Sequence, residues 1–425
     1  MPRILFATDV PPWPPTNGSF QRSNLIHRAL REVGDVDLVM AGRGLTLTPE
    51  AREALTREFN MVGELAAPPR HAYQPWATLH PLAPKLVEWK LVYALGRKKI
   101  DYQPNPQALQ WLSRRMAECQ YDVIVGRCLS ATCIVGALNY QPVIVDIDDL
   151  DTQKVRSKLD TPSKFRQRLH LTTRYHLRQL RNLVPRRISQ CARAWVVSAD
   201  DQRELGFDHV SLLPNVPFTH DSADPPACPP RPGSRVLLTV AVMDWGPNER
   251  GIDHFVTRVW PRVRAACPHA TFRIVGKNMF PEQRQRWGAV PGVEPVGFVE
   301  NLTAEYDRCA FAVATVFQGG GSKIKVLEAL GHQRTCVVTE HSHRGYEHVL
   351  LHRQSLWAGY TDEAFADGCI HLLKHPEEQA AMAAVGRSLV LKHFSYRGFR
   401  DIVKRDVAAV MATPQGALRP AGQTL

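Results

Sequence analysis

The fold is decided by the stretch Thr315-Val-Phe-Gln-Gly-Gly-Gly-Ser-Lys-Ile-Lys-Val-Leu-Glu-Ala-Leu330, where a short apolar run gives way to three glycines and then to a helical pattern. The glycines let backbone N–H groups approach a bound oxyanion closely, and Ser322 suits the N-cap of the following helix. A helix N-terminus carries about half a positive charge, and Lys323 and Lys325 add to it. The stretch therefore predicts an anion cradle, because a plain strand-to-helix turn would not need the entropic cost of three glycines.

Length and composition indicate a folded protein of two domains. A chain of 425 residues exceeds one ordinary core, and its 44% apolar and 22% charged residues are typical of globular proteins. No apolar run is long enough to cross a bilayer, and the first residues lack the layout of a signal peptide. The nine cysteines form no CxxC pair, which favours reduced thiols. We therefore expect a cytoplasmic protein.

The net charge of +12 indicates an anionic partner. Acidic lipid and phosphorylated substrates fit, whereas no recognised nucleic-acid module occurs, so nucleic acid is not expected. Between residues 152 and 199, twelve Lys or Arg accompany a single acid, Asp160, on a helical spacing interrupted at Pro185. The basic face over residues 154–187 indicates either a solvated helix or a peripheral contact with anionic membrane at its inner face.

The first half alternates strands and helices. Residues 3–9, 19–33 and 36–40 predict a strand, a helix and a strand, which form a βαβ unit. Parallel sheets bind ligands at the carboxyl ends of their strands, so residues 14–22 lie at a binding mouth. Arg22 is a candidate contact for an anion or substrate, and equally a solvated surface residue.

Carboxylates crowd the end of a later strand. Residues 121–125 and 142–146 predict buried strands, and the second runs into Ile147-Asp-Asp-Leu-Asp151. The pattern Asp146-x-Asp148 resembles a metal-binding DxD, but we favour a loop carboxylate at the cleft. The preceding residues 68–118 are rich in proline and aromatic side chains. They suit an acceptor platform or a membrane-facing surface, although loops packed over the first domain are favoured.

The second half restarts the alternation after a proline-rich linker. Residues 236–242, 271–277, 293–299, 311–316 and 335–339 predict the strands of another α/β layer. The chain therefore divides into a first domain 1–217, a linker 218–234, a second domain 235–395, a C-terminal helix 396–412 that packs back on the first domain, and a disordered tail 413–425.

The second half carries a series of short motifs: Asp244-Trp-Gly-Pro-Asn248, Trp260-Pro261, Phe272-Arg-Ile-Val-Gly276, Gly297-Phe298-Val299, Gly319-Gly-Gly-Ser-Lys-Ile-Lys-Val-Leu-Glu-Ala329 and Arg344-Gly345. The series resembles the C-terminal domain of family 4 glycosyltransferases. The first half resembles the family more thinly, through Pro14-Pro-Thr-Asn-Gly18 with Arg22, Asp148-Asp149, Val196-Val-Ser198 and Leu213-Pro-Asn-Val216. The resemblance implies an α/β protein of the GT-B fold, with two Rossmann-like domains facing across a cleft. It also implies sugar transfer with retention of configuration and no essential metal.

The resemblance implies roles for individual residues. Glu328 takes the place of a ribose-binding Glu, and Lys323, followed by Lys325, matches the basic residue that holds the diphosphate. Gly320 stands where many members have a sugar-binding Glu. The donor-binding residues implied in this way are Asn17, Gly18, Asn248, Arg250, Lys277, Phe298, Gly319, Gly320, Gly321, Ser322, Lys323, Lys325 and Glu328.

The catalytic residues expected from the resemblance are Lys323, Asp148 and Asp149. The N–H groups of residues 319–322 and the Lys323 cation would meet the charge that develops on the leaving diphosphate. The departing phosphate would then deprotonate the acceptor hydroxyl. The histidine that the family usually carries on its first domain has no counterpart here, and Asp148 or Asp149 stands nearby instead. Arg22 is the expected acceptor contact.

Two functions are consistent with these residues. The first is a retaining glycosyltransferase of glycan, polysaccharide or glycoconjugate biosynthesis, which uses a nucleotide-diphosphate sugar, a glycan, lipid-linked or small-molecule acceptor, and no further cofactor. The alternative is a catalytically inactive GT-B protein that binds a nucleotide sugar or an anionic glycan, as Gly320 and the missing histidine suggest. His341 and His343 lie toward the same mouth and are expected to be surface residues unless they touch a substrate.

Overall fold

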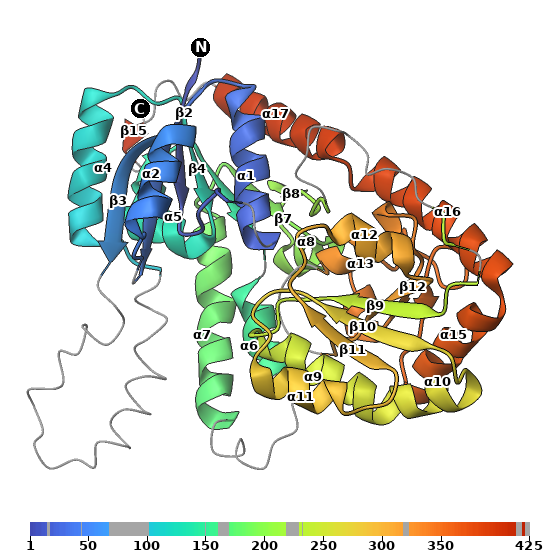
Figure 1. Cartoon of the computed structure of the whole chain (residues 1–425). Coiled ribbons are helices and arrows are strands. Elements are labelled where there is room, and N and C mark those ends of the chain that lie inside the picture. The colour runs from blue at the N-terminus through green and yellow to red at the C-terminus, as the bar shows by residue number, and fades with distance from the viewer. Residues whose placement is uncertain are drawn as a thin grey trace, which may run out of the picture. The chain divides into compact units, whose positions relative to one another are not determined.

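The computed structural model describes residues 1–14, 18–43, 45–67, 102–148, 150–159, 170–217, 229–231, 233–317, 323–413 and 419–420. The chain divides into two compact units, called unit 1 and unit 2 from here on (Figure 1). Unit 1 comprises Met1–Pro214 and Phe399–Leu425, and unit 2 comprises Asn215–Gly398. Each unit is built on a parallel β-sheet and is described by itself.

Unit 1 is built on a seven-stranded sheet in the order β3-β2-β1-β4-β6-β7-β8. All neighbouring strands in it pair in parallel. The strands are β1 (Arg3–Thr8), β2 (Asp35–Arg43), β3 (Asn60–Ala67), β4 (Val123–Arg127), β6 (Val143–Ile147), β7 (Arg193–Val196) and β8 (Val210–Leu212). The central strands are nearly continuous apolar runs, because both faces of a parallel sheet are covered by helices.

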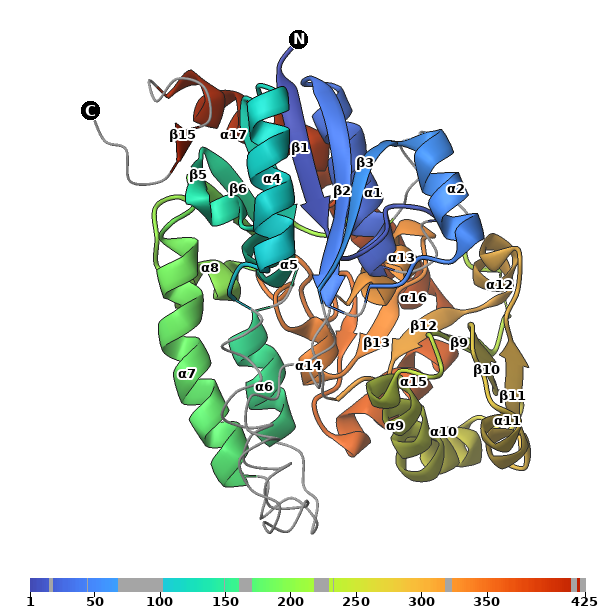
Figure 2. The same ribbon diagram turned by 90° about the vertical axis from the view of Figure 1, so that its left-hand side faces the viewer.

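Helices lie on both faces of this sheet (Figure 2). They are α1 (Gly18–Arg31), α2 (Pro49–Glu58), α4 (Pro106–Glu118), α5 (Leu129–Val135), α6 (Asp151–Leu159), α7 (His170–Ile188), α8 (Ala199–Leu205) and α17 (Tyr396–Ala412). Leu5 and Ala7 of β1 belong to one buried cluster with side chains of α4, α5 and α7. A short antiparallel pair, β5 (Tyr140–Gln141) with β15 (Arg419–Pro420), lies outside the main sheet.

Helix α17 returns the end of the chain to unit 1. The Trp195 side chain of β7 donates a hydrogen bond from Nε1 to Asp406 Oδ2 at 2.9 Å. On the surface, Lys404 of α17 lies 3.1 Å from the carboxylate of Glu32, just beyond the end of α1. In Figure 1, one end of α17 lies beside the upper end of α1.

Unit 2 is built on a six-stranded sheet in the order β11-β10-β9-β12-β13-β14, again with parallel neighbours. Its strands are β9 (Val236–Val240), β10 (Thr271–Val275), β11 (Val293–Gly297), β12 (Phe311–Ala314), β13 (Cys336–Val338) and β14 (Trp357–Ala358). Its helices are α9 (Gly246–His254), α10 (Trp260–Ala266), α11 (Pro281–Gly288), α12 (Leu302–Arg308), α13 (Ile324–Gly331), α14 (Glu340–His343), α15 (Asp362–Lys374) and α16 (Pro376–His393).

The unit 2 sheet is packed on both faces. One buried cluster centres on aromatic rings, with Phe255 and Phe272 at 4.6 Å between ring centroids. The other cluster joins β9 and β12 to the apolar side of α13, through Leu238, Val326 and Leu330. Because the apolar side of α13 is buried in this cluster, the first turn of the helix is held at the carboxyl ends of the strands.

Both sheets have a switch point, where successive strands extend the sheet in opposite directions. In unit 1 the switch lies between β1 and β4, and in unit 2 it lies between β9 and β12. Ligands of such sheets bind outside the carboxyl ends of the strands at the switch point. The predicted α/β fold of two Rossmann-like domains is confirmed in each unit.

Three local predictions need correction. Helix α7 continues through Pro185 to Ile188, since a proline so near the end removes only one backbone hydrogen bond. Helix α13 begins at Ile324 and has Lys323 at its N-cap, where the sequence predicts Ser322. Within residues 68–118, the part from Pro106 onward is a regular helix whose N-cap is Asn105, whereas residues 68–101 lie outside the described part.

No disulfide joins the cysteines of the described residues, and all of them except Cys128 are buried. Among the helices that the structure describes, none has both the length and the apolar character needed to cross a membrane.

Candidate functional site

The switch point of unit 2 holds several of the residues predicted to bind a donor. Asn248 and Arg250 lie on α9, which follows β9, and Lys325 and Glu328 lie on α13, which follows β12. The glycine loop itself, with Gly319, Gly320, Gly321 and Ser322, lies outside the described residues. Polar side chains precede and follow that loop in the chain.

Lys325 is held by Asn248. The Nζ atom of Lys325 donates a hydrogen bond to Asn248 Oδ1 at 2.7 Å, and Asn248 Nδ2 donates to the carbonyl of Val242 at 2.8 Å. Burial lowers the pKa of Lys325 to about 8. Because the amide of Asn248 is neutral, this hydrogen bond does not neutralise the charge of the Lys325 ammonium group. Asn248 thus positions Lys325.

Glu328 lies one turn further along α13. Its Oε2 accepts a long hydrogen bond of 3.4 Å from the hydroxyl of Tyr306 on α12. Burial raises the pKa of Glu328 to about 7, although Tyr306 and Lys325 oppose the shift. The Tyr306 ring stacks on His332, with 4.4 Å between ring centroids and 12° between planes. The carboxyl group is therefore held from the core side.

A cationic cluster surrounds His341. This residue lies on α14, just after the carboxyl end of β13. Burial, together with the charges of Lys323, Arg344 and Lys325, lowers the pKa of His341 to about 3. Four basic side chains from α13, α14 and the residues that cap these helices therefore converge, and the imidazole among them is neutral. An anion placed here would meet fixed positive charge without first breaking a pair between Lys325 and a carboxylate.

His343 is not a surface residue. It is 4% exposed, its Nε2 lies 2.6 Å from the carbonyl oxygen of Leu350, and its Nδ1 lies 2.8 Å from the hydroxyl of Tyr360. The expectation of a surface histidine is therefore wrong for His343, because these two bonds give it a buried structural place. His341 is half-buried and belongs to the cationic cluster.

Lys277 and Phe298 lie at the carboxyl ends of β10 and β11. The Lys277 ammonium lies 5.1 Å from the centroid of the Phe298 ring, and this ring is 59% exposed. Gly276 precedes them with φ of 150°, and a Cβ there would stand 1.6 Å from the carbonyl oxygen of Ala241. Only glycine permits this close approach, which brings Lys277 beside the end of β9. Arg250 is exposed on α9.

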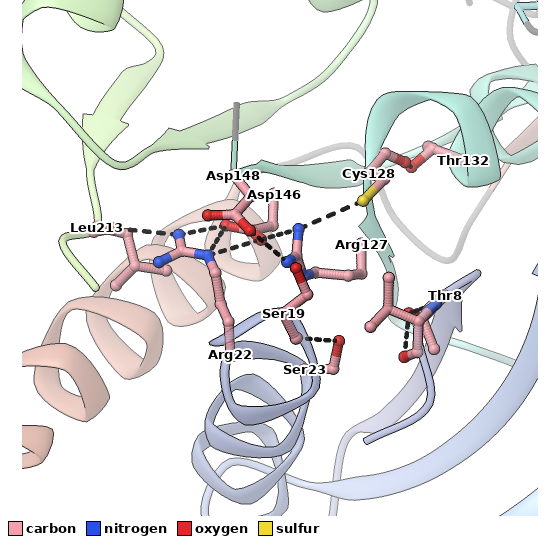
Figure 3. Close-up of polar contacts among 11 residues, drawn as sticks. Thr8, Ser19, Arg22, Ser23, Arg127, Cys128, Thr132, Asp146, Asp148 and Leu213 are labelled. Atoms are coloured by element: carbon pink, nitrogen blue, oxygen red, sulfur yellow. Dashed lines mark hydrogen bonds and ion pairs between the residues drawn. The ribbon is translucent and has the colours of Figure 1, made fainter. Parts of the chain in front are cut away.

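The switch point of unit 1 holds a chain of buried ion pairs (Figure 3). Arg22, on the second turn of α1, donates to Asp146 of β6 from Nε at 2.9 Å and from Nη2 at 2.5 Å. Its Nη2 also donates to the carbonyl of Leu213 at 3.0 Å. The side chains of Arg22 and Asp146 are 1% and 0% exposed.

Arg127, the last residue of β4, extends the chain of ion pairs. Its Nη1 lies 3.2 Å from Asp146 Oδ2, and its Nη2 donates to Asp148 Oδ2 at 3.0 Å. The side chain of Arg127 is 1% exposed, and that of Asp148 is 15% exposed. Burial opposes the charge of Arg127, yet Cys128, Asp148, Asp146 and Asp9 raise its pKa above the ordinary arginine value.

These contacts decide between the alternatives left open for Arg22 and for Asp146. Arg22 is not solvated, because its guanidinium is buried against Asp146. Asp146 does not present a metal-binding DxD, since guanidinium groups occupy both of its carboxylate oxygens. Within the described ranges, no three His, Cys, Asp or Glu side chains are placed to share a metal ion. Asn17 and Asp149 lie outside the described residues, and Gly18 is the first residue of α1.

Two residues of these sites were missed by sequence reasoning. Arg127 carries a usable signal, because it ends the apolar run Tyr121-Asp-Val-Ile-Val-Gly-Arg127 at the carboxyl end of a strand. Tyr306 carries none, since a tyrosine on a half-buried helix is ordinary core composition. Only the fold brings it next to Glu328.

Comparisons of sequence match only unit 2. Residues 234–375 match a family described as glycosyl transferases group 1. Among curated protein sequences, none matches this chain. The matched region begins just before β9 and ends after α15, so it includes α9, α13, α14 and their polar side chains.

Comparisons of structure cover both units. TarM is similar at a TM-score of 0.64 with 9% identity, over 96% of this chain and 99% of that chain. HepE of Anabaena in complex with UDP gives 0.60 with 14% identity, over 96% and 100%. Sucrose-phosphate synthase of Thermosynechococcus elongatus gives 0.61 with 14% identity, over 96% and 99%. These likenesses show that the two α/β units have the fold of GT-B glycosyltransferase structures.

Proposed function

We propose that the protein is a glycosyltransferase that moves a sugar from a nucleotide-diphosphate sugar to an acceptor hydroxyl, with retention of configuration. The observation that carries the proposal is the convergence of Lys323, Lys325, Arg344 and neutral His341 at the switch point of unit 2. Such a cluster suits a diphosphate, and the match of residues 234–375 to glycosyl transferases group 1 covers it.

Similar structures support the choice of donor and acceptor. HepE structures contain UDP and UDP-glucose, and a structure of S. aureus TarM contains UDP together with a glycosylated glycerol. We propose a nucleotide-diphosphate sugar as donor and a glycan, lipid-linked or small-molecule hydroxyl as acceptor for this chain. The absence of disulfides among the described cysteines supports work in a reducing compartment, the cytoplasm.

The residues divide the work as follows. Lys323 and Lys325 bind the diphosphate and stabilise the charge that develops as the sugar–phosphate bond breaks. Glu328 accepts hydrogen bonds from the ribose hydroxyls. Because these cations are part of the protein, no metal ion is required for the departure of the diphosphate. The oxygen of the leaving phosphate takes the proton of the acceptor hydroxyl on the same face of the sugar.

The test is a titration of the full chain with nucleoside diphosphates and their sugars. Binding is measured by calorimetry and by thermal shift, with and without EDTA. One base should raise the melting temperature, since a ligand that binds only the native state stabilises it, and EDTA should not change the affinity. Lys323→Ala should lower turnover by about 30-fold, the loss of one charge-assisted hydrogen bond, with an unchanged melting temperature. The anomeric proton of the product, followed by NMR, reports retention.

The matched control is Lys374→Ala on α15, an exposed lysine of the same unit, which should retain full turnover. Undiminished turnover in Lys323→Ala would exclude the assignment. The alternative, a catalytically inactive protein that binds a nucleotide sugar or an anionic glycan, is supported instead if a nucleotide sugar binds but is neither transferred nor hydrolysed by the wild type.

We also propose that α7 contacts anionic membrane from unit 1. Arg174, Arg178 and Arg181 recur at helical spacing on α7, are exposed, and have no ion-pair partner among the described residues. Co-sedimentation should increase with the fraction of anionic lipid in vesicles and fall in the triple Ala variant. Equal binding to neutral and anionic vesicles would remove this proposal.

A further inference from the structure

The buried ion pairs of unit 1 call for an explanation other than stability. Arg22, Asp146 and Arg127 are almost completely buried, and charges are costly to remove from water. Apolar side chains of similar volume often stabilise a fold as well or better. The pairs lie at the carboxyl ends of β4 and β6, beside the start of α1, which is where a doubly wound sheet binds ligands. Their position therefore points to a role in ligand binding.

Exposure changes along the chain of ion pairs. Arg22, at one end, is fixed by Asp146, by the carbonyl of Leu213 and by the ring of Phe399, 5.6 Å from its guanidinium carbon. Asp148, at the other end, is the one member with appreciable exposure, at 15% of its side chain. The three buried members thus form a rigid support, and the carboxylate of Asp148 is the group presented at the surface.

The turn after β4 fixes the direction of Arg127. Gly126 packs so closely on Thr132 of α5 that a Cβ would stand 1.9 Å from Oγ1 of that residue. Cys128 adopts φ of 66°, a conformation rare for a residue with a side chain. Its backbone N–H donates to the carbonyl of Asp146 at 2.9 Å, and its sulfur accepts from Arg127 Nη1 at 3.3 Å. Strained backbone of this kind gathers at functional sites.

We propose that Arg127 is a positioning residue that holds Asp148 to accept a hydrogen bond from the acceptor, and that the acceptor presents an uncharged hydroxyl there. This inference rests on the proposed glycosyltransferase function. Asp148 accepts the hydrogen bond and takes no proton, because the proton of the reacting hydroxyl goes to the departing phosphate oxygen as the new glycosidic bond forms. The support for Asp148 thus serves to orient the acceptor.

The local charge gives the specificity. Asp9, Asp146 and Asp148 all act on the charge of Arg127. Together with Arg22, the described residues of the cluster are three carboxylates and two guanidinium groups. A phosphate or carboxylate on the acceptor next to the hydroxyl bound by Asp148 would be repelled, whereas neutral sugar or polyol hydroxyls would be accepted. The acceptor class is therefore a neutral polyhydroxyl surface.

The experiment compares Asp148→Asn, Arg127→Lys and the double variant in steady-state transfer. Asp148→Asn should lower kcat/KM for the acceptor by about 30-fold, as expected for a hydrogen bond to a charged group, with the donor KM changed less than about twofold. Arg127→Lys keeps the positive charge but loses the planar guanidinium group, so it should give a smaller loss of acceptor kcat/KM. The double variant should have an acceptor kcat/KM no lower than that of Asp148→Asn. Asp200→Asn, which removes an exposed pair with Arg203, is the matched control and should have no effect.

A second readout is the preference between a neutral acceptor and the same acceptor carrying a phosphate. The wild type should prefer the neutral one, and Asp148→Asn should reduce that preference. Asp148→Glu, which keeps a carboxylate, should retain part of the preference for the neutral acceptor. If Arg127→Lys does not fold, the two Asp148 variants decide the question alone. An acceptor kcat/KM of Asp148→Asn within about twofold of wild type would overturn this inference and leave the glycosyltransferase assignment in place. A wild type that neither binds nor turns over any nucleotide sugar would remove both.

Discussion

Both sheets carry cationic side chains at their switch points. In unit 1 the cations are paired with carboxylates, whereas in unit 2 Lys325 is bonded to a neutral amide. At the switch point of unit 1, both guanidinium groups are paired with the buried carboxylate of Asp146, and that of Arg127 is also paired with Asp148. At the switch point of unit 2, Lys325 is hydrogen-bonded to the neutral amide of Asn248. The neighbouring carboxyl group of Glu328 has its pKa raised to about 7 by burial. Equivalent positions of two similar sheets therefore hold different electrostatic environments.

The difference indicates which ligand each unit suits. A cation that is already paired gains little from an anionic ligand, because the ligand must displace the partner. The charge of a cation held by a neutral partner is not neutralised, so the cation can attract and bind a phosphate. Unit 2 is accordingly suited to a diphosphate, and unit 1 to an uncharged hydroxyl. The comparison predicts that charge removal will affect stability in unit 1 and ligand affinity in unit 2.

The largest expected effect is on the stability of unit 1. Asp146→Asn leaves the guanidinium groups of Arg22 and Arg127 buried without the carboxylate between them, so unfolding should become easier by about 3–5 kcal/mol. Hydrogen exchange measured by mass spectrometry should show faster exchange in β4 and β6, with β9 and β12 unchanged. The variant Lys325→Met in unit 2 should show no such loss, since burial of its charge is unfavourable in the folded state.

Glu32→Gln is the control for this prediction. The Glu32 carboxylate also has two cationic partners, with Lys404 at 3.1 Å and Arg400 at 3.7 Å, but its side chain is 38% exposed. Exposed pairs of this kind contribute about 1 kcal/mol or less. A similar loss of exchange protection in Glu32→Gln and Asp146→Asn would contradict the view that the unit 1 pairs are buried supports.

Much of this architecture is predictable from the sequence, for identifiable physical reasons. The apolar runs of β1, β9 and β12 stand out because both faces of a parallel sheet are buried, and the helix after the glycine loop follows from its apolar spacing. Lys325 and Glu328 fall on that helix at a fixed distance from the glycines. Local patterns therefore locate the donor side of the site.

The ion pairs of unit 1 are not predictable in this way. Arg22 and Asp146 are separated by 124 positions, and nothing local distinguishes a paired arginine from a solvated one. The same holds for Tyr306 and Glu328, which meet only when α12 and α13 pack on one sheet. Side-chain pairing across a fold depends on three-dimensional distances, so sequence reasoning left Arg22 open between two interpretations and missed Arg127 altogether.

A smaller effect, on pH dependence, would sharpen the comparison. The pKa of Lys325 in the free protein is about 8, and a bound diphosphate favours the charged form. Affinity for a nucleoside diphosphate should therefore fall as pH rises above 8, approaching tenfold per pH unit, because binding must take up a proton from solution. Calorimetry in buffers of different ionisation enthalpy measures this uptake. Lys325→Arg stays charged throughout and should flatten the profile. The arginines of unit 1 cannot lose their charge in this pH range, so they contribute no such dependence. If the pH profile of affinity is unchanged in Lys325→Arg, the titrating group is not Lys325.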